Sequence, residues 1–205
     1  APIVLAITMK KDPVKKGMRL VVAMEVGTFC EGRNKAHKPK GGLSPGSELH
    51  DAEFVPFFAR AEELQILVMV HPYVRSFHHS SAYYLQNLIG NPVETTRAIA
   101  SLIFGGVLER FPGLKLLFAH GGGVAPYLIG RWGHGHAHRE EPRAKFTGSV
   151  DEMFHRLYFD TVLYDRNVLR FLIDSAGADH ILLGTDYSGD MSCWREVPEL
   201  RKVHF

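Results

Sequence analysis

The distribution of apolar residues constrains the fold more than any other feature of this chain. Five short runs rich in Val, Ile, Leu and Phe recur along it, and each is too short for a typical helix, which favours buried strands. The runs are RLVVAMEV (19–26), ILVMVH (66–71), LKLLFAH (114–120), LYFDTV (157–162) and HILLGTD (180–186).

Each of these runs is separated from the next by a segment whose apolar residues favour a helix. Asp51 stands at the N-cap position of the first segment, and Gly177 lies near the end of the last. The second segment has Pro92 at its start and is ended by Pro112. The segments are 51–65, 92–112, a helix near 124–132 within the less regular region 121–156, and 166–180. Strands that alternate with helices predict crossover connections and a parallel sheet, and therefore an α/β fold.

Bulk composition indicates one domain spanning residues 1–205, with 45% apolar residues available for a core. A net charge of +2 makes no case for a nucleic acid or membrane partner. The basic runs at 10–16 and 32–40 lie among Pro and Gly, which favours solvated loops over an anion-binding patch. Cys30 and Cys193 form no disulfide framework, and no apolar run reaches the ~18 residues of a membrane span, so we expect a cytoplasmic protein.

Polar residues close four of the predicted strands: His71, His120, Asp160 and Asp186. This end of the strands is where a parallel α/β barrel builds its active site, and it is also the ligand edge of an open doubly wound sheet. Only five strands can be recognised, whereas a closed barrel of this type needs eight.

The strand that ends in His120 is followed at once by three glycines, in LLFAHGGG. Glycines permit a sharp turn and let a ligand approach without side chains in the way. A lone histidine there would be read as a core residue bonded to a carbonyl, but His71 and Asp186 end neighbouring strands. Two imidazoles and a carboxylate at one mouth predict a zinc-like divalent ion, with independent structural roles as the alternative.

Other polar residues leave their roles open. Asp186, in GTDYS, could instead be a turn or N-cap residue, and Asp160 could orient a neighbouring strand end or be purely structural. Arg131, in PYLIGRW, suits a forked hydrogen bond to a substrate carboxylate or a surface ion pair. The histidines of HGHAH (134–138) lie in a glycine-rich stretch expected to be irregular and exposed, and His78-His79 is read in the same way.

The longest ordered motifs resemble the amidohydrolase-2 branch of the metal-dependent amidohydrolase superfamily, and particularly its members similar to aminocarboxymuconate-semialdehyde decarboxylase. The segments that carry the resemblance are NPVETTRAIASLIFGGVLERFPGLKLLFAHGGGVAPYLIGRWGHG (91–135) and LYFDTVLYDRNVLRFLIDSAGADHILLGTDY (157–187). The resemblance implies a distorted (β/α)8 barrel with one divalent metal, usually zinc, at its C-terminal mouth.

The resemblance also implies roles for four residues. His71 matches a metal-ligand histidine, His120 a histidine beside the metal that acts in acid–base catalysis, and Asp186 a metal-binding aspartate. We count all three as metal ligands, and His120 and Asp186 as catalytic. Arg131 matches an arginine that reaches a substrate carboxylate, in some members across a dimer interface.

The chain departs from the family pattern at its start, where no first strand carries the HxH or ExH motif that supplies two metal ligands in the family. RLVVAMEV resembles the fourth strand of the family, so we expect an incomplete barrel of about strands 4 to 8. The implied reaction is non-oxidative decarboxylation of an unsaturated or aromatic carboxylic acid by a homo-oligomer, a dimer. The alternatives are a lactone or amide hydrolase, and a non-catalytic fragment or subunit.

Overall fold

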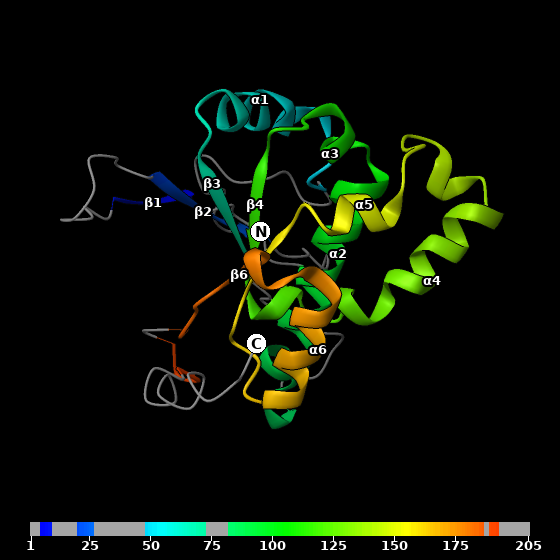
Figure 1. Cartoon of the computed structure of the whole chain (residues 1–205). Coiled ribbons are helices and arrows are strands. Elements are labelled where there is room, and N and C mark those ends of the chain that lie inside the picture. Colours follow the sequence, from blue (N-terminus) through cyan, green and yellow to red (C-terminus); the bar gives the residue numbers. More distant parts are fainter. Residues whose placement is uncertain (1–4, 10–19, 27–47, 73–81, 187–188, 193–205) are drawn as a thin grey trace.

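The computed structural model of the chain describes residues 5–9, 20–26, 48–72, 82–186 and 189–192 (Figure 1). Six strands form one sheet in the order in which they occur along the chain. Their bounds are β1 Leu5–Met9, β2 Leu20–Val26, β3 Leu67–Pro72, β4 Lys115–Phe118, β5 Tyr158–Asp160 and β6 Ile181–Leu182. The pairs from β2 to β6 are all parallel, and only β1 runs antiparallel, against β2.

The five predicted strands are therefore present, in the sequential parallel order of a barrel arc. The antiparallel strand β1 was not predicted, because the short run LAITM carries no signal that separates an edge strand from a loop. The later strands are shorter than their apolar runs, and β6 has only two residues. Because the chain leaves the sheet early, His120 and Asp186 lie just beyond β4 and β6 and not within them.

Helices connect the parallel strands. They are α1 Val55–Glu63, α2 Asn91–Phe104, α3 Val107–Arg110, α4 Ala125–His138, α5 Val150–Phe154 and α6 Arg166–Ala176. Short helical turns accompany them: η1 Ala52–Phe54, η2 Ala82–Tyr84, η3 Gln86–Gly90, η4 His120–Gly122, η5 Glu141–Arg143 and η6 Ala178–His180. None of the helices in the described part of the chain is both long and apolar enough to cross a membrane.

The prediction of a single helix over 92–112 is wrong, because this segment is divided into α2 and α3 at Gly105-Gly106. Gly106 has a left-handed backbone (φ +73°), and a Cβ on it would lie 2.4 Å from the carbonyl oxygen of Lys145. The start is as predicted, with Pro92 in the first turn of α2. Asp51 also precedes a helical turn, but its carboxylate accepts from the Glu48 N–H at 2.7 Å and does not cap the turn.

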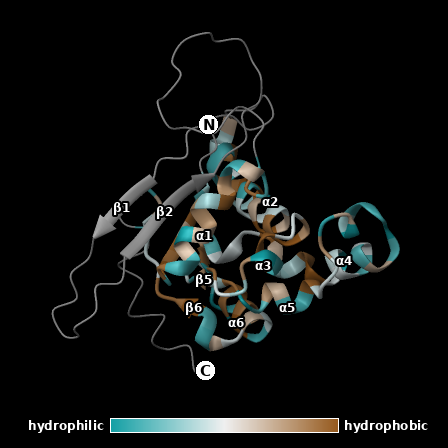
Figure 2. Ribbon diagram, turned by 90° about the horizontal axis from the view of Figure 1, so that it is seen from above, coloured by the Kyte–Doolittle hydropathy of each residue, from teal (hydrophilic) through white to brown (hydrophobic). Residues whose placement is uncertain are grey.

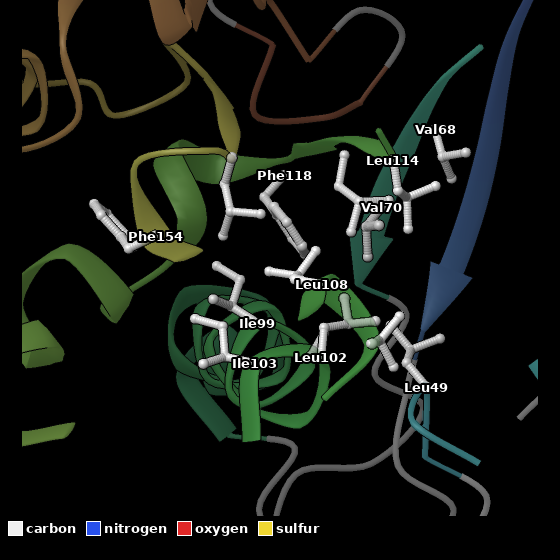
Figure 3. Close-up of a cluster of buried hydrophobic side chains, with 14 of the residues drawn as sticks. Leu49, Val68, Val70, Ile99, Leu102, Ile103, Leu108, Leu114, Phe118 and Phe154 are labelled. Carbon is white, nitrogen blue, oxygen red and sulfur yellow. The ribbon is translucent and has the colours of Figure 1, made fainter. Parts of the chain in front are cut away.

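The core lies between the sheet and α2. Figure 3 shows Ile99, Leu102 and Ile103 of α2 projecting toward the side chains of the adjoining strands, among them Val70 and Phe118. All five are at most 1% exposed. Burying one such side chain contributes about 1.5–3 kcal/mol, so this packing holds the ends of β3 and β4 firmly in place.

The two sides of the molecule differ in how they are packed. Hydrophobic residues gather where the central helices meet the sheet (Figure 2), whereas α4 extends away from the body at the end opposite β1 and β2 (Figures 1 and 2). In α4 only Ala125 is buried. The helix that follows the glycine turn is therefore anchored at its start and only partly covered along the rest of its length, where Ile129 and Trp132 pack against the core.

Candidate metal centre

Three sequence-predicted site residues come together at the carboxyl ends of the strands. His71 lies in β3, His120 follows β4, and Asp186 follows β6, and each offers a ligand atom within 4.8 Å of the other two. The two imidazole rings meet edge to face, with centroids 5.1 Å apart and an interplanar angle of 63°. All three residues are half-buried, so the cluster lies at a mouth and not in the closed core.

The register of the sheet brings these residues together. Val70 pairs with Phe118 across β3 and β4, so the next residue of β3 lies near the exit of β4. The Ala119 N–H donates to the Val70 carbonyl at 3.1 Å and extends this alignment by one residue. Because parallel strands end at one edge of the sheet, residues distant in sequence converge there.

The glycines after His120 are required by both conformation and space. His120, Gly121, Gly122 and Gly123 have φ values of +56°, +58°, +78° and +65°, a left-handed run that costs about 1–2 kcal/mol at a non-glycine residue. A Cβ on Gly122 would lie 2.6 Å from the Phe159 ring. A Cβ on Gly123 would lie 2.2 Å from a backbone oxygen of α2. Only His120, whose side chain forms the cluster, keeps a side chain in this turn.

The environment of the His120 imidazole favours a ring that donates an electron pair to a metal ion. Burial lowers its pKa, and the negative charge of Asp186 opposes that shift. Its Nδ1 atom is buried and has no hydrogen-bond partner among the described residues. An unsatisfied buried polar atom costs about 1–3 kcal/mol, and buried orphans of this kind call for a partner such as an ion. A second imidazole and a carboxylate lie beside it, so the three residues fit a divalent cation.

Asp160 is buried next to the turn that carries His120, but it is not one of the three cluster residues. It is 5% exposed, and its Oδ1 accepts from the Gly121 N–H at 2.9 Å and from the Val162 N–H at 3.2 Å. Burial raises the pKa of Asp160 to about 6, although these donors and the nearby His71 favour its ionised form. Of the roles left open by the sequence, these contacts favour orienting the neighbouring strand end.

The segment that carries Asp186 is held by contacts on both sides. Before it, the Thr161 hydroxyl bonds the Gly184 N–H at 3.1 Å and donates to the Gly184 carbonyl at 3.2 Å. After it, the Gly189 N–H donates to the Asp186 carbonyl. Asp186 itself has a left-handed backbone (φ +52°), and its side chain belongs to the cluster.

Two tyrosines that the sequence did not single out secure the same segment. The Tyr84 hydroxyl donates to Asp190 Oδ2 at 2.6 Å and accepts from Asn87 Nδ2 at 3.0 Å. The Tyr164 hydroxyl donates to the Met191 carbonyl at 2.9 Å. The hydrogen bond to Asp190 raises the pKa of Tyr84, with a smaller contribution from Asp186. An isolated tyrosine carries no sequence signal for such a long-range contact.

Arg131 lies outside the cluster. It is exposed on α4, six residues beyond the start of that helix, which corresponds to about 9 Å along the axis. Among the described residues it makes no hydrogen bond or ion pair, so the surface ion pair is not found there, and its role toward a substrate carboxylate stays a prediction.

The HGHAH stretch was wrongly expected to be irregular, because it forms the last turns of α4. His134 and His138 are exposed as expected, and their rings stack with centroids 4.2 Å apart. His136 is half-buried, and its Nε2 bonds the Phe146 carbonyl at 2.9 Å. His78-His79, both cysteines and both basic runs lie outside the described residues.

Comparison with known proteins is consistent with this geometry. Residues 32–198 match the family model described as Amidohydrolase. A 2-amino-3-carboxymuconate-6-semialdehyde decarboxylase from Dictyostelium discoideum is 38% identical over 144 residues, covering 69% of this chain and 40% of that protein. A 6-methylsalicylic acid decarboxylase from Penicillium expansum is 30% identical over 141 residues, covering 68% of this chain and 44% of the relative.

Solved structures share the fold. A 5-carboxyvanillate decarboxylase from Sphingomonas paucimobilis superposes with a TM-score of 0.70 at 22% identity, covering 79% of this chain and 51% of that one. A dihydroxybenzoic acid decarboxylase from Polaromonas, with bound manganese, has a TM-score of 0.63 at 22% identity, covering 74% and 48% of the two chains. The chain spans about half the length of these structures and less than half of the curated relatives it matches. Its sheet is accordingly part of an amidohydrolase-type barrel, and the chain belongs to the amidohydrolase family.

Proposed function

We propose that this chain carries the metal centre of a non-oxidative decarboxylase acting on an unsaturated or aromatic carboxylic acid. One observation carries the proposal: ligand atoms of His71, His120 and Asp186 lie within 4.8 Å of one another at the strand ends. The similarity to decarboxylases that act on such acids supports this choice of reaction.

The three residues would together hold one divalent ion, for which we propose zinc. Two imidazoles and a carboxylate suit zinc, although manganese, found in one of the similar structures, also accepts them. When bound, the ion would supply Lewis-acid polarisation of a substrate oxygen.

The residues of the chain would carry out the proton transfer. In decarboxylation the bond to the carboxyl carbon breaks, carbon dioxide leaves, and the electron pair stays on the remaining carbon, which takes up a proton. Burial lowers the pKa of His120 and favours its neutral ring, whose one nitrogen lone pair would either bind the ion or accept a proton and pass it on. In the second of these roles Asp186 would assist, because its negative charge favours the protonated form of His120.

Arg131 would hold the substrate carboxylate by a forked hydrogen bond. Because it is exposed on α4 and apart from the cluster of its own chain, we propose that it serves the site of a second copy in a homodimer. Light scattering tests the dimer, and a monomer that retains full activity would contradict this role.

A cytoplasmic location of the protein belongs to the same proposal, and cell fractionation tests it.

Metal stoichiometry is the first test. Protein stripped with a chelator and reloaded with zinc should retain one zinc per chain by elemental mass spectrometry, and His71→Ala and Asp186→Ala should each abolish retention. His134→Ala/His138→Ala removes the exposed pair on α4 and is the matched control, which should keep the zinc. Loss of zinc only in this control would place the metal on α4 and overturn the proposal.

The reaction is tested separately, by carbon dioxide release from aromatic and unsaturated acids. Hydrolysis of a lactone or amide, without carbon dioxide, would favour the hydrolase alternative. An unmodified chain that retains no zinc would favour a non-catalytic fragment or subunit, since binding would then require the HxH or ExH ligand pair that the family pattern includes.

A further inference from the structure

Asp160 is a buried acid for which the proposed reaction has no direct use. It stands at the end of β5, between the strand ends that carry His120 and Asp186. At 5% exposure its desolvation is expensive, and an apolar side chain would fill the same space without that penalty. A carboxylate at this position therefore needs an explanation in what it bonds.

Its contacts point first to the turn after His120. The turn has no side chains beyond His120 itself, and its own hydrogen bonds, Gly122 N–H to Ala119 and Gly123 N–H to His120, are internal. The Asp160 carboxylate, which accepts from the Gly121 N–H at 2.9 Å, ties the turn to the neighbouring strand. Hydrogen bonds to a charged acceptor are stronger than those to a neutral one, so this bond helps to offset the backbone strain at His120, the non-glycine left-handed residue of the turn.

The same strand end also supports the segment that leads to Asp186. A Cβ on Gly184 would lie 2.8 Å from the Asp160 Cβ, so the backbone of this segment rests directly on the Asp160 side chain. The adjoining Thr161 hydroxyl bonds both the N–H and the carbonyl of Gly184. Asp186 lies two positions further on. Asp160 and Thr161 thus contact both the turn that carries His120 and the segment that carries Asp186.

We propose that Asp160 is a positioning residue of the metal centre, whose carboxylate holds the His120 turn at a set distance from the segment that carries Asp186. This inference rests on the proposed metal site. It goes beyond that site because it assigns the ligand spacing to a residue that touches neither metal nor substrate. Removal of a group that orients a metal ligand typically lowers the metal affinity by about 10–100-fold.

Three variants separate positioning from general stability. Asp160→Asn keeps an Oδ1 acceptor of the same size, whereas Asp160→Leu keeps the volume and removes the acceptor. Asp165→Ala is the matched control, because Asp165 also accepts from two backbone N–H groups, at 2.8 and 3.0 Å, but does so at the exposed start of α6. Loss of this helix cap should lower the stability of the chain without changing the metal site.

The first measurement is zinc affinity by chelator competition, combined with the visible absorption spectrum of cobalt-substituted protein, which reports ligand geometry. Asp160→Leu should bind zinc at least about 10-fold more weakly and shift the cobalt spectrum. The zinc affinity of Asp160→Asn should stay within about 3-fold of that of the unmodified protein, and its cobalt spectrum should be unchanged. Asp165→Ala should lower the Tm and leave both readouts unchanged. A folded Asp160→Leu variant with the original affinity and spectrum would overturn the proposal.

The second measurement needs neither metal nor a folded Leu variant. Amide hydrogen exchange in the metal-free protein should show the Gly121 N–H protected, and protection should persist in Asp160→Asn. A Gly121 amide that exchanges freely in the unmodified protein overturns the positioning role. If instead the amide is protected and no variant or parent binds zinc, the proposed function fails while the contact made by Asp160 stands.

Discussion

Two stretches of this chain combine histidine with glycine, and they behave in opposite ways. In AHGGG, at the end of β4, the glycines are left-handed and closely packed, and the histidine is half-buried beside two other candidate ligands. In GHGHAH, at the end of α4, a Cβ on Gly133 or Gly135 would meet nothing within 4 Å, and two of the histidines are exposed. Similar composition thus forms a site only where parallel strands bring distant residues together.

The largest expected effect comes from adding one methyl group to the first stretch. Gly123→Ala places a Cβ in a left-handed residue (φ +65°) and 2.2 Å from the Pro92 carbonyl oxygen, which cannot move without shifting α2. We expect the free energy of unfolding to fall by more than about 3 kcal/mol, measured by urea denaturation. A fall of less than 1 kcal/mol, a threshold well below that estimate, would mean that the turn is not held as described.

The second effect concerns pH and the buried acid below the turn. The pKa of Asp160 is about 6 in the folded chain, against an ordinary value of 3.8. Because the folded-state pKa is raised, the stabilising contribution is fully present below pH 3.8 and is lost as the pH rises through about 6. At 1.36 kcal/mol per pH unit, a shift of about 2 units corresponds to at most about 3 kcal/mol.

The Asp160→Asn variant isolates this effect, because it cannot ionise. In the presence of chelator, the unmodified chain should lose stability relative to Asp160→Asn between pH 4 and pH 7, as followed by urea denaturation. Parallel stability curves across this pH range would contradict the raised pKa.

The third effect contrasts the two groups of histidines through ligand-linked stability. Zinc at 100 times its dissociation constant should stabilise the chain by about 2.7 kcal/mol, visible as an increase in Tm. His120→Ala should abolish the increase, whereas His138→Ala should leave it intact, since His138 bonds only the preceding turn of its own helix among the described residues. Equal losses in the two variants would remove the distinction between the stretches.

The smallest expected effect has the opposite sign. Gly135→Ala adds a methyl group within α4, in open space, and replaces a poor helix former by the best one. The free energy of unfolding should rise by about 0.5–1 kcal/mol, measured under the conditions used for Gly123→Ala. A decrease would indicate that this face of α4 packs against something beyond the described residues.

Local pattern alone was sufficient for much of this molecule. Apolar runs between helical segments predicted five parallel strands at the right places, because buried parallel strands need continuous apolar side chains on both faces. The positions of His71, His120 and Asp186 at the ends of three runs predicted their convergence, since parallel strands end at a common edge. The glycines after His120 were likewise readable as a turn, because their freedom of backbone conformation is a local property.

What local pattern left open depends on contacts between segments far apart in the chain. Helical spacing continued through Gly105-Gly106, and the break there reflects the close approach of Lys145 to the backbone of Gly106. The same holds for the tyrosines that secure the segment after Asp186 and for the exposed position of Arg131 on α4. Asp160 shows the principle most clearly: as one aspartate in YFDTV it had several possible roles, and only its burial and its bond to Gly121 identify it as a support for the site. Burial and hydrogen bonding are properties of the assembled chain, so tertiary structure had to decide them.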